Sequence, residues 1–390
     1  MGKESRNRVL RVVVAGGFLK SYIEGLLAAV VGLLIVSPAV GDLGVSLFLG
    51  VGSAAHIVFT LMSGFLVRKT GVRRLMIASA VLPAVAVVFY VLPTFGVVSL
   101  IAGNAIKGVS FGILTAVSPL LIVEGAEVRC RGRGSALFQL SMQIGLVAGA
   151  LIGAGVAGLF GHRPAWAIDI DFLLMLLPAS VYLAAVLRLP DFTRGDAGRC
   201  YPQKAHGKDL RAILPAVGFM VLMSASGIGT VMNYSVVLLA DAGFMGASAN
   251  LVDALLRMFS IVAVVGAVGL VDRIGRVSLL RTGVCLMVLG FAGAALTSGW
   301  AFAASLLLAV SAFSGGFGVC AWVVVPELLP ANVRAQGTSL ALFAGQITTC
   351  VMITFFPQVR ACCGDASVFW LFAAVSAVSF FYFGIIRQKS

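Results

Sequence analysis

The strongest constraint on the fold is a series of long apolar segments that recur along the whole chain. A helix that crosses a bilayer needs about 20 mainly apolar residues. Twelve segments qualify: residues 12–36, 45–67, 75–93, 97–123, 134–159, 165–187, 212–240, 249–271, 278–298, 300–325, 336–357 and 366–386. They are continuous and lack the apolar–polar alternation of membrane strands. We therefore expect an all-α integral membrane protein with twelve transmembrane helices.

Composition and charge agree with a membrane protein. Of 390 residues, 60% are hydrophobic and 11% are charged, whereas a soluble domain has about 25% charged residues. The net charge of +13 does not indicate nucleic-acid binding, because the basic residues lie between the apolar segments. With a cytoplasmic N-terminus, 23 of the 28 Lys and Arg residues fall on the cytoplasmic side. We expect a multi-pass protein of the cytoplasmic membrane with both termini in the cytoplasm.

Motifs of catalysis and metal binding are missing from the sequence. The seven cysteines and three histidines are scattered without metal-ligand spacing, and no phosphate-binding loop occurs. We therefore expect no metal, no cofactor and no enzymatic activity. A channel is also disfavoured, because no segment is typical of a selectivity filter.

A polar stretch in mid-chain divides the sequence into two halves. Residues 190–209 read PDFTRGDAGRCYPQKAHGKD, which is rich in charge, Gly and Pro. We predict a cytoplasmic linker over 190–210 that joins an N-terminal six-helix half, 1–189, to a C-terminal six-helix half, 211–390.

Two landmarks recur after nearly the same interval. Gly71 in GFLVRKTGVRR matches Gly275 in GLVDRIGRVSLL, 204 residues later. A Glu followed seven residues later by an Arg occurs at 124–131 and again at 327–334, an offset of 203. A shared offset for two separate patterns indicates an internal duplication. Both halves start on the cytoplasmic side, so the repeats are expected to be parallel.

Several segments resemble motifs of the major facilitator superfamily and, within it, of the sugar porter family. VDRIGR at 271–276 is similar to the superfamily loop motif, and GFLVRKTGVRR at 64–74 is a weaker copy. PLLIVEGAEVRCRGRGSALFQ at 119–139, VVVPELLPANVRAQG at 323–337 and PDFTR at 190–194 resemble sugar porter patterns. The resemblance implies transport of a small solute by rocking of two helical halves.

Charged residues at the cytoplasmic ends of the predicted helices are candidates for a gate. They are Glu124, Arg131, Asp272, Arg276, Glu327 and Arg334. Partly buried ion pairs that form in one conformation can bias an equilibrium between two states. Anchoring of the loops by the positive-inside rule is the alternative, but it does not explain the repeated Glu-to-Arg spacing. The loop at 64–74 has Arg68 where its repeat has Asp272, so we expect the gate to be asymmetric.

Three charges are predicted near the middle of the membrane. Lys20 and Glu24 lie one turn apart in one apolar segment, and Lys107 lies at a similar depth in another. An ionisable group at this depth is a functional hypothesis by default. The resemblance places the sugar porters' helix 1 acid at Ile23 and their helix 4 Arg at Asn104, so both charges are displaced here. We interpret Glu24 as a proton-binding carboxylate whose pairing with Lys20 or Lys107 changes during transport. A static Lys20–Glu24 pair is the alternative.

Two other groups of charges are given structural interpretations. Asp253 and Arg257 are one turn apart and are predicted to form a structural pair. Asp169 and Asp171 lie near the outer end of their segment and are expected at the membrane interface.

Polar and aromatic residues within the segments are candidates for substrate binding. They are Gln139, Gln143, Asn233, Tyr234 and Trp322. Amide groups can bind hydroxyls in two places, and an aromatic face can pack on a sugar ring. The resemblance places Gln139 and Trp322 on a glutamine and a tryptophan that sugar porters use. Other sugar porter ligands are replaced, by Met223, Ser224, Gly229, Ser260, Gly345 and Gln346.

Together these features predict a secondary active transporter that acts as a monomer in the lipid bilayer. Its partners are expected to be a small polar solute, sugar-like or an organic acid, and protons. An efflux antiporter for amphipathic compounds and an uncoupled facilitator are the alternatives.

Overall fold

The computed structural model describes residues 3–36, 41–91, 96–125, 131–160, 164–188, 209–244 and 247–387, and all regular structure in these ranges is helical. The helices are α1 Lys3–Val36, α2 Gly41–Thr70, α3 Val72–Val91, α4 Val97–Gly125, α5 Arg131–Phe160, α6 Pro164–Leu174, α7 Leu176–Leu187, α9 Asp209–Ala225, α10 Ile228–Asp241, α11 Ala247–Ile274, α12 Arg276–Leu296, α13 Gly299–Ala312, the π-helix η3 Phe313–Gly318, α14 Val319–Glu327, α15 Arg334–Cys363 and α16 Asp365–Arg387.

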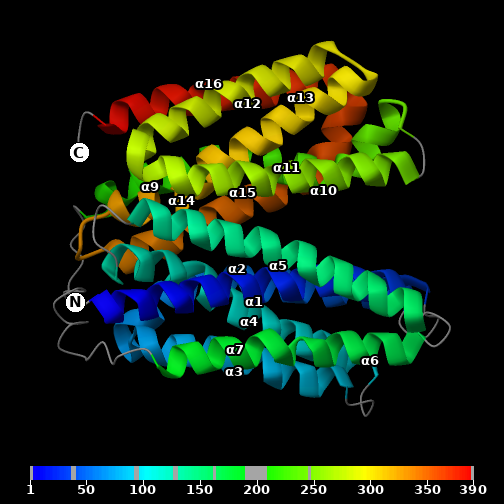
Figure 1. The fold of residues 1–390 in the computed structure, drawn as a ribbon, viewed down its shortest axis with the longest axis vertical. Helices are drawn as coiled ribbons and strands as arrows, with labels where there is room; N and C mark the ends of the chain where they lie inside the picture. The colour runs from blue at the N-terminus through cyan, green and yellow to red at the C-terminus, as the bar shows by residue number, and fades with distance from the viewer. Residues whose placement is uncertain are drawn as a thin grey trace. The chain divides into compact units, whose positions relative to one another are not determined.

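The chain forms two compact units (Figure 1). The first comprises Met1–Glu127, Leu137–Ala205 and Ala331–Leu340, and the second comprises Val128–Ala136, His206–Pro330 and Ala341–Ser390. The predicted linker, 190–210, falls almost entirely outside the described residues.

The helices agree with the predicted membrane spans. Eleven spans in the described residues are long and apolar enough to cross a membrane, and the remaining predicted segment, 12–36, lies within α1. The prediction of an all-α protein with twelve long helices is therefore confirmed.

Hydropathy did not predict the breaks inside three of these spans. Between α6 and α7 the chain turns at Met175, close to Pro178, which has no N–H to bond the oxygen of Leu174. Between α9 and α10, Gly227 adopts a φ of 83°, which the helix cannot accommodate. The third break is the π-helix η3, whose sequence is FSGGFG.

In the first unit, α4 is the central helix. It packs against α1, α2 and α3, and 83% of its most apolar window is buried, compared with 22% for α2. Glycines make the close approach to α2 possible. A side chain at Gly108 would meet the backbone oxygen of Gly52 at 2.3 Å, and one at Gly112 would meet that of His56 at 2.7 Å. This packing carries residues of α2 and α4 toward one another.

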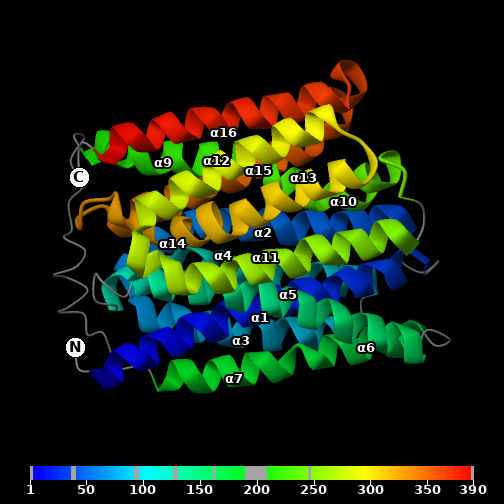
Figure 2. The same ribbon diagram turned by 45° about the horizontal axis from the view of Figure 1, so that its top comes forward.

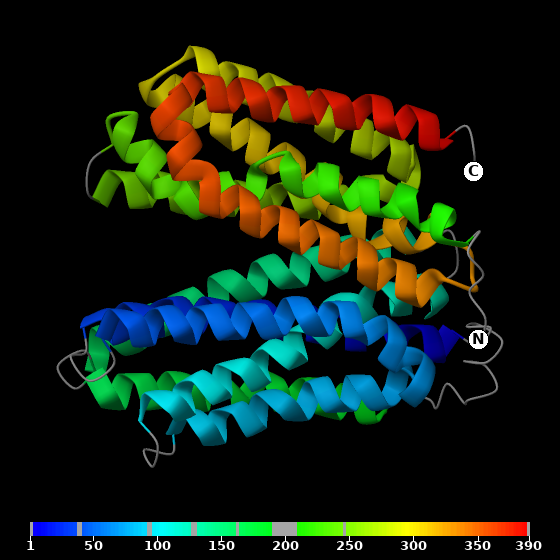
Figure 3. The same ribbon diagram turned by 180° about the vertical axis from the view of Figure 1, so that it is seen from behind.

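In the second unit, α12 packs along α13 and α16 (Figures 1 and 2). The span formed by α13, η3 and α14 is the most buried there, with 72% of its most apolar window buried. Gly316 of η3 lies against Gly283 of α12, where a side chain would come within 2.8 Å of the Gly283 Cα. The helix α15 has 30 residues and is drawn in orange to orange-red in Figure 3.

The turns after α2 and α11 each contain a glycine with a positive φ. Gly71 has a φ of 87° and Gly275 a φ of 82°, both in the left-handed region that favours glycine. Each glycine separates two long helices with one residue. The matching positions of these two glycines in the sequence therefore reflect a matching local structure.

Candidate functional site

A cluster of basic side chains surrounds one aromatic ring in the first unit. We call it the Phe111 cluster, and its residues are Lys20 and Glu24 of α1, His56 of α2, and Lys107, Phe111 and Thr115 of α4. The three charges that the sequence placed at one depth thus belong to one group of side chains.

Two ammonium groups lie over the same ring. The Nζ atoms of Lys20 and Lys107 are 5.8 Å and 5.1 Å from the centre of the Phe111 ring. Both distances are within the range of cation–π attraction. Lys20 also forms an ion pair with Glu24, Nζ to Oε1 3.1 Å. Among the described residues, Lys107 forms no salt bridge, although the charge of Glu24 acts on it.

The same ring contacts a histidine. His56 meets Phe111 edge to face, with ring centres 6.2 Å apart. Its Nε2 shares a hydrogen bond of 3.0 Å with Thr115 Oγ1. Sequence reasoning did not include His56, Phe111 or Thr115 in the site. The available indication was the spacing of four residues that puts Phe111 and Thr115 on the Lys107 face of α4.

The exposure of the ion pair is uneven. The Lys20 side chain is 11% exposed, whereas the Glu24 side chain is 37% exposed. The carboxylate is therefore the part of the pair that a proton or a solute can reach. If both lysines and Glu24 are ionised, the cluster carries a net charge of +1, and bilayer depth makes that charge costly.

The predicted substrate residues fall in both units. Gln139 and Gln143 are half-buried on α5 in the first unit. In the second unit, Trp322 is half-buried on α14. Asn233 is exposed and donates to the backbone oxygen of Gly229 at 2.7 Å.

Tyr234 is held by a neighbouring helix of the second unit. Its hydroxyl donates to the oxygen of Ile353 at 3.2 Å, and its ring lies 4.9 Å from that of Phe356. The assignment of these five residues to a substrate site stays a prediction.

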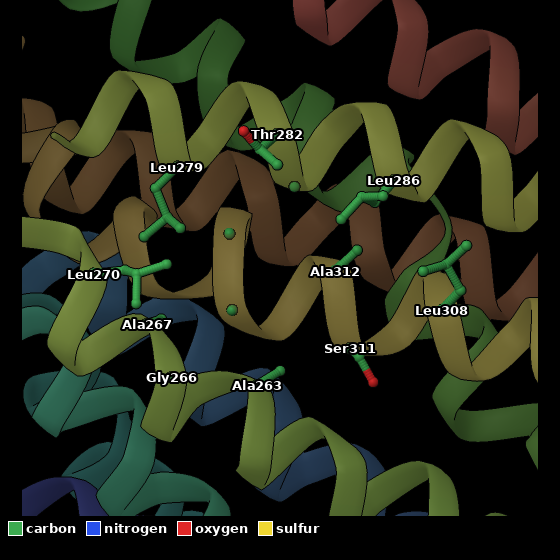
Figure 4. A pocket seen from close by; sticks show the side chains of 13 residues that line it. Ala263, Gly266, Ala267, Leu270, Leu279, Thr282, Leu286, Leu308, Ser311 and Ala312 are labelled. Carbon is green, nitrogen blue, oxygen red and sulfur yellow. The ribbon is translucent and has the colours of Figure 1, made fainter. Parts of the chain in front are cut away.

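A pocket of about 290 Å³ in the second unit is too apolar to bind a polyol. It lies among α11, α12, α13 and η3, and its wall consists mainly of Ala, Gly and Leu (Figure 4). Thr282 and Ser311 supply the hydroxyls, and Thr282 donates to Ser278 of its own helix at 3.0 Å. A polar solute there would lose its bonds to water without replacement.

One glutamate binds two arginines near the end of α14. Arg131 Nη1 donates to Glu327 Oε1 at 3.1 Å, and Arg276 Nη1 donates to the other oxygen, Oε2. All three side chains are 19–24% exposed, so both pairs are partly shielded from water. We call these residues the Glu327 latch, and all of them lie in the second unit.

The latch includes three of the six predicted gate residues. The sequence spacing pointed to Glu327 with Arg334, but the described partners of Glu327 are Arg131 and Arg276. Arg334 is half-buried at the start of α15. The side chains of Glu124 and Asp272 lie outside the described part of the chain.

The two groups of structural charges differ. Asp253 accepts from Arg257 Nε at 2.9 Å and from Ser235 Oγ at 2.5 Å, so the predicted pair is confirmed. The interfacial depth expected for Asp169 and Asp171 stays a prediction, but Asp171 packs inside the protein. Its side chain is fully buried, and neither carboxylate oxygen has a hydrogen-bond partner among the described residues. Near Asp171, Phe172 stacks on Tyr90 with ring centres 4.1 Å apart, so aromatic packing encloses this part of α6.

The helical architecture is that of the major facilitator superfamily. The chain is similar to the structure of the proton:xylose symporter XylE bound to 6-bromo-6-deoxy-D-glucose, with a TM-score of 0.83 at 18% identity, covering 98% of this chain and 96% of that one. It also resembles the E. coli fucose:proton symporter FucP, with a TM-score of 0.80 at 12% identity over 97% and 98% of the chains. For the human organic anion transporter MFSD10 the TM-score is 0.74 at 17% identity, over 98% and 100%. The chain therefore has the fold of a multi-pass membrane transporter.

Sequence comparison defines the family within that class. The family model "Sugar (and other) transporter" matches residues 12–194 and 199–387, so the chain belongs to this family of transporters and is not an enzyme. It is 26% identical to D-xylose-proton symporter-like 1 of Arabidopsis thaliana over an alignment of 368 residues, and that alignment covers 80% of this chain and 72% of the relative. It is 24% identical over 367 residues to the glucose transporter GlcP of Staphylococcus epidermidis, covering 82% and 80%. The predicted resemblance to sugar porters is thereby confirmed.

Proposed function

We propose that this chain is a secondary active transporter that moves a small polar solute, a sugar or a related compound, across the cytoplasmic membrane together with protons. Family membership supports the solute class, and the names of relatives such as D-xylose-proton symporter-like 1 support proton coupling. The observation that carries the proposal is the Lys20–Glu24 ion pair beside Lys107.

Glu24 is the proposed proton carrier. Its carboxylate is the more exposed member of a pair within a helix, and protonation would remove the negative charge that holds Lys20. The lysine would then be available to another partner. Solute binding and protonation are in this way linked through one side chain.

The Glu327 latch is proposed to act as the cytoplasmic gate. Arg131 precedes the linker in sequence and Glu327 follows it, so the two belong to different predicted halves, 1–189 and 211–390. A transporter that rocks about its linker, 190–210, must break this pair in one of its states. Breaking a partly buried ion pair costs free energy, so the latch would stabilise the state in which the pair is formed.

The five predicted polar and aromatic residues are proposed to bind the solute. Gln139 and Gln143 from α5 would bind hydroxyls, and Asn233, Tyr234 and Trp322 would supply an amide, a phenol and an indole. We further propose that a monomer suffices for transport and that both termini are cytoplasmic.

Uptake into proteoliposomes tests this function. The purified protein is supplied with radiolabelled sugars, polyols, carboxylates and amino acids, with and without an inward proton gradient. Glu24→Gln should abolish accumulation that depends on the gradient, while exchange of solute at equal concentration continues. Asp241→Asn, at an exposed acid at the end of α10, is the matched control and should accumulate normally.

Three results would contradict the proposal. A Glu24→Gln protein with unchanged accumulation and pH dependence would exclude Glu24 as the proton carrier. Equilibration without accumulation in the unsubstituted protein would indicate an uncoupled facilitator. Extrusion of amphipathic dyes, with no uptake of the polar solutes, would indicate an efflux antiporter.

A further inference from the structure

The Phe111 cluster contains more positive than negative charge. Lys20 and Lys107 contribute two ammonium groups, and Glu24 contributes one carboxylate. Among the described residues, Lys20 has an acid as a direct partner, whereas Lys107 rests on an aromatic ring. A ring face offers an ammonium group less stabilisation than a carboxylate does. Lys107 is therefore suited to receive an anionic group.

Proton coupling decides which solute matches this charge. The cluster with both lysines and Glu24 ionised has a net charge of +1. A proton on Glu24 raises that charge to +2, and a neutral solute leaves it there. A solute with one negative charge returns it to +1. Because each added charge is costly at bilayer depth, the proton and a monoanion favour each other's binding.

Both ammonium groups lie beside one aromatic ring. The Nζ atoms of Lys20 and Lys107 lie 5.8 Å and 5.1 Å from the centre of one ring, that of Phe111. Once Glu24 is protonated, Lys20 has lost its ionic partner, and an anion can take the place of that carboxylate. The edge-to-face contact with His56 fixes the ring that positions them.

The neutral hydrogen-bonding groups of sugar porters are correspondingly reduced. Positions that resemble sugar ligands of that family hold Met223 and Gly229 here, which cannot donate from a side chain to a hydroxyl. Gln143, half-buried on α5 of the same unit as the two lysines, can bind hydroxyl groups. A hydroxylated acid uses both kinds of group, whereas a neutral sugar leaves the lysines without an anionic partner.

We infer that the solute is a monoanionic hydroxylated carboxylate, such as a sugar acid, whose carboxylate binds between Lys20 and Lys107 when Glu24 carries a proton. This inference rests on the proposed function, since it names the solute class of the same transporter. Transport of one proton with one monoanion moves no net charge.

Three matched probes test the charge of the solute. D-glucuronate carries a carboxylate, D-glucuronamide replaces it with a neutral amide, and D-glucose has a hydroxymethyl group on the same ring. In proteoliposomes with an inward proton gradient, uptake of D-glucuronate should exceed that of both neutral compounds at least tenfold. An imposed potassium diffusion potential should not change its accumulation.

Variants of Lys107 test the proposed contact. Lys107→Met should reduce glucuronate uptake at low concentration at least tenfold, and Lys107→Arg should retain most of it. Lys69→Met, at an exposed lysine in the last turn of α2, is the control and should leave uptake unchanged. Monodispersity in size-exclusion chromatography and the melting temperature show whether each variant is folded.

The outcomes separate this inference from the proposed function. Proton-driven uptake of D-glucose or D-glucuronamide equal to that of D-glucuronate, or full glucuronate uptake by Lys107→Met, overturns the inference and leaves the transporter standing. If glucuronate raises the melting temperature of the unsubstituted protein but not of Lys107→Met, and no probe accumulates, the binding inference holds and coupled transport fails. Absence of both glucuronate uptake and thermal stabilisation overturns the inference, and absence of proton-driven uptake of every solute in the wider panel overturns the proposed function.

Discussion

Replacing Glu327 with glutamine tests the latch directly. Glu327→Gln keeps the shape of the side chain but removes the charge that Arg131 and Arg276 share. The amide can accept with one oxygen only, and its NH₂ group faces the second guanidinium as a donor. We therefore expect the variant to populate the state in which the first turn of α5 separates from α14.

The structure sets the size of this effect. Hydrogen bonds to charged groups contribute about 1.5–3 kcal/mol when buried, and exposed ion pairs contribute about 0.2–1 kcal/mol. With side chains 19–24% exposed, each pair falls between these limits, at about 1 kcal/mol. Separation of α5 from α14 breaks the Arg131 pair alone, because Arg276 lies on α12. Its loss amounts to about 1 kcal/mol, or roughly a 5-fold shift in the equilibrium between states.

A buried serine provides the position for the assay. Ser135 on α5 is 1% exposed, and its hydroxyl donates to the backbone oxygen of Val319 on α14. Ser135→Cys is introduced after the seven native cysteines are replaced, and its reaction with N-ethylmaleimide is timed. Because the reagent reaches this site only when α5 and α14 separate, Glu327→Gln should speed labelling by up to about 5-fold.

A second acid–arginine pair serves as the control. Asp365 pairs with Arg360 at 2.9 Å, but its side chain is 47% exposed. Asp365→Asn should leave labelling at position 135 unchanged. Equal labelling rates in Glu327→Gln and the unsubstituted background would show that the latch does not set the equilibrium, and equal acceleration by Asp365→Asn would show a general loss of stability.

Three further substitutions test the packing and the buried charges. Gly149→Ala on α5 should lower the melting temperature by several degrees, since the new Cβ would lie 2.1 Å from a backbone oxygen of α1; Gly158→Ala on the same helix, with nothing within 4 Å, should not lower it. Gly275→Ala should cost about 1 kcal/mol, because alanine is strained at a φ of 82°, and a melting temperature equal to that of Gly158→Ala would contradict this. Asp171→Asn should leave stability unchanged or raise it, since the carboxylate oxygens of Asp171 have no hydrogen-bond partner among the described residues. Asp253→Asn should lower stability by about 1–3 kcal/mol, because it weakens the contacts with Ser235 and Arg257. Thermal unfolding of each variant in detergent, without denaturant, measures these changes. An equal loss of stability in Asp171→Asn and Asp253→Asn would refute the difference expected between the two aspartates.

Local chemistry explains which parts of the fold could be predicted. Hydropathy located the helices because a spanning segment must be apolar along its own length, whatever it packs against. The Lys20–Glu24 and Asp253–Arg257 pairs were predictable for a similar reason, since four residues bring two side chains onto one face of any helix. The repeat matched Gly71 with Gly275, and both glycines have a positive φ, 87° and 82°.

Contacts between helices could not be predicted in this way. The ring of Phe111 meets side chains from α1 and α2, and these contacts depend on how three helices are rotated about their axes. The close contacts of Gly108 and Gly112 with the backbone of α2 set the rotation of α4 relative to α2. The same applies to Asp171, which the rotation of α6 buries completely among its neighbours.

The partners of the intramembrane acids show where coupling chemistry can reside. Asp253 accepts from both Arg257 and Ser235, so its charge is balanced within the second unit. Separating such an acid from its partners would leave a buried charge uncompensated. This cost keeps the ion pair formed. Glu24 has one direct cationic partner, an exposed carboxylate and a second lysine nearby, so it can change partner at lower cost. We infer that Glu24 serves transport and Asp253 serves stability, although each lies four residues from a cation on its own helix.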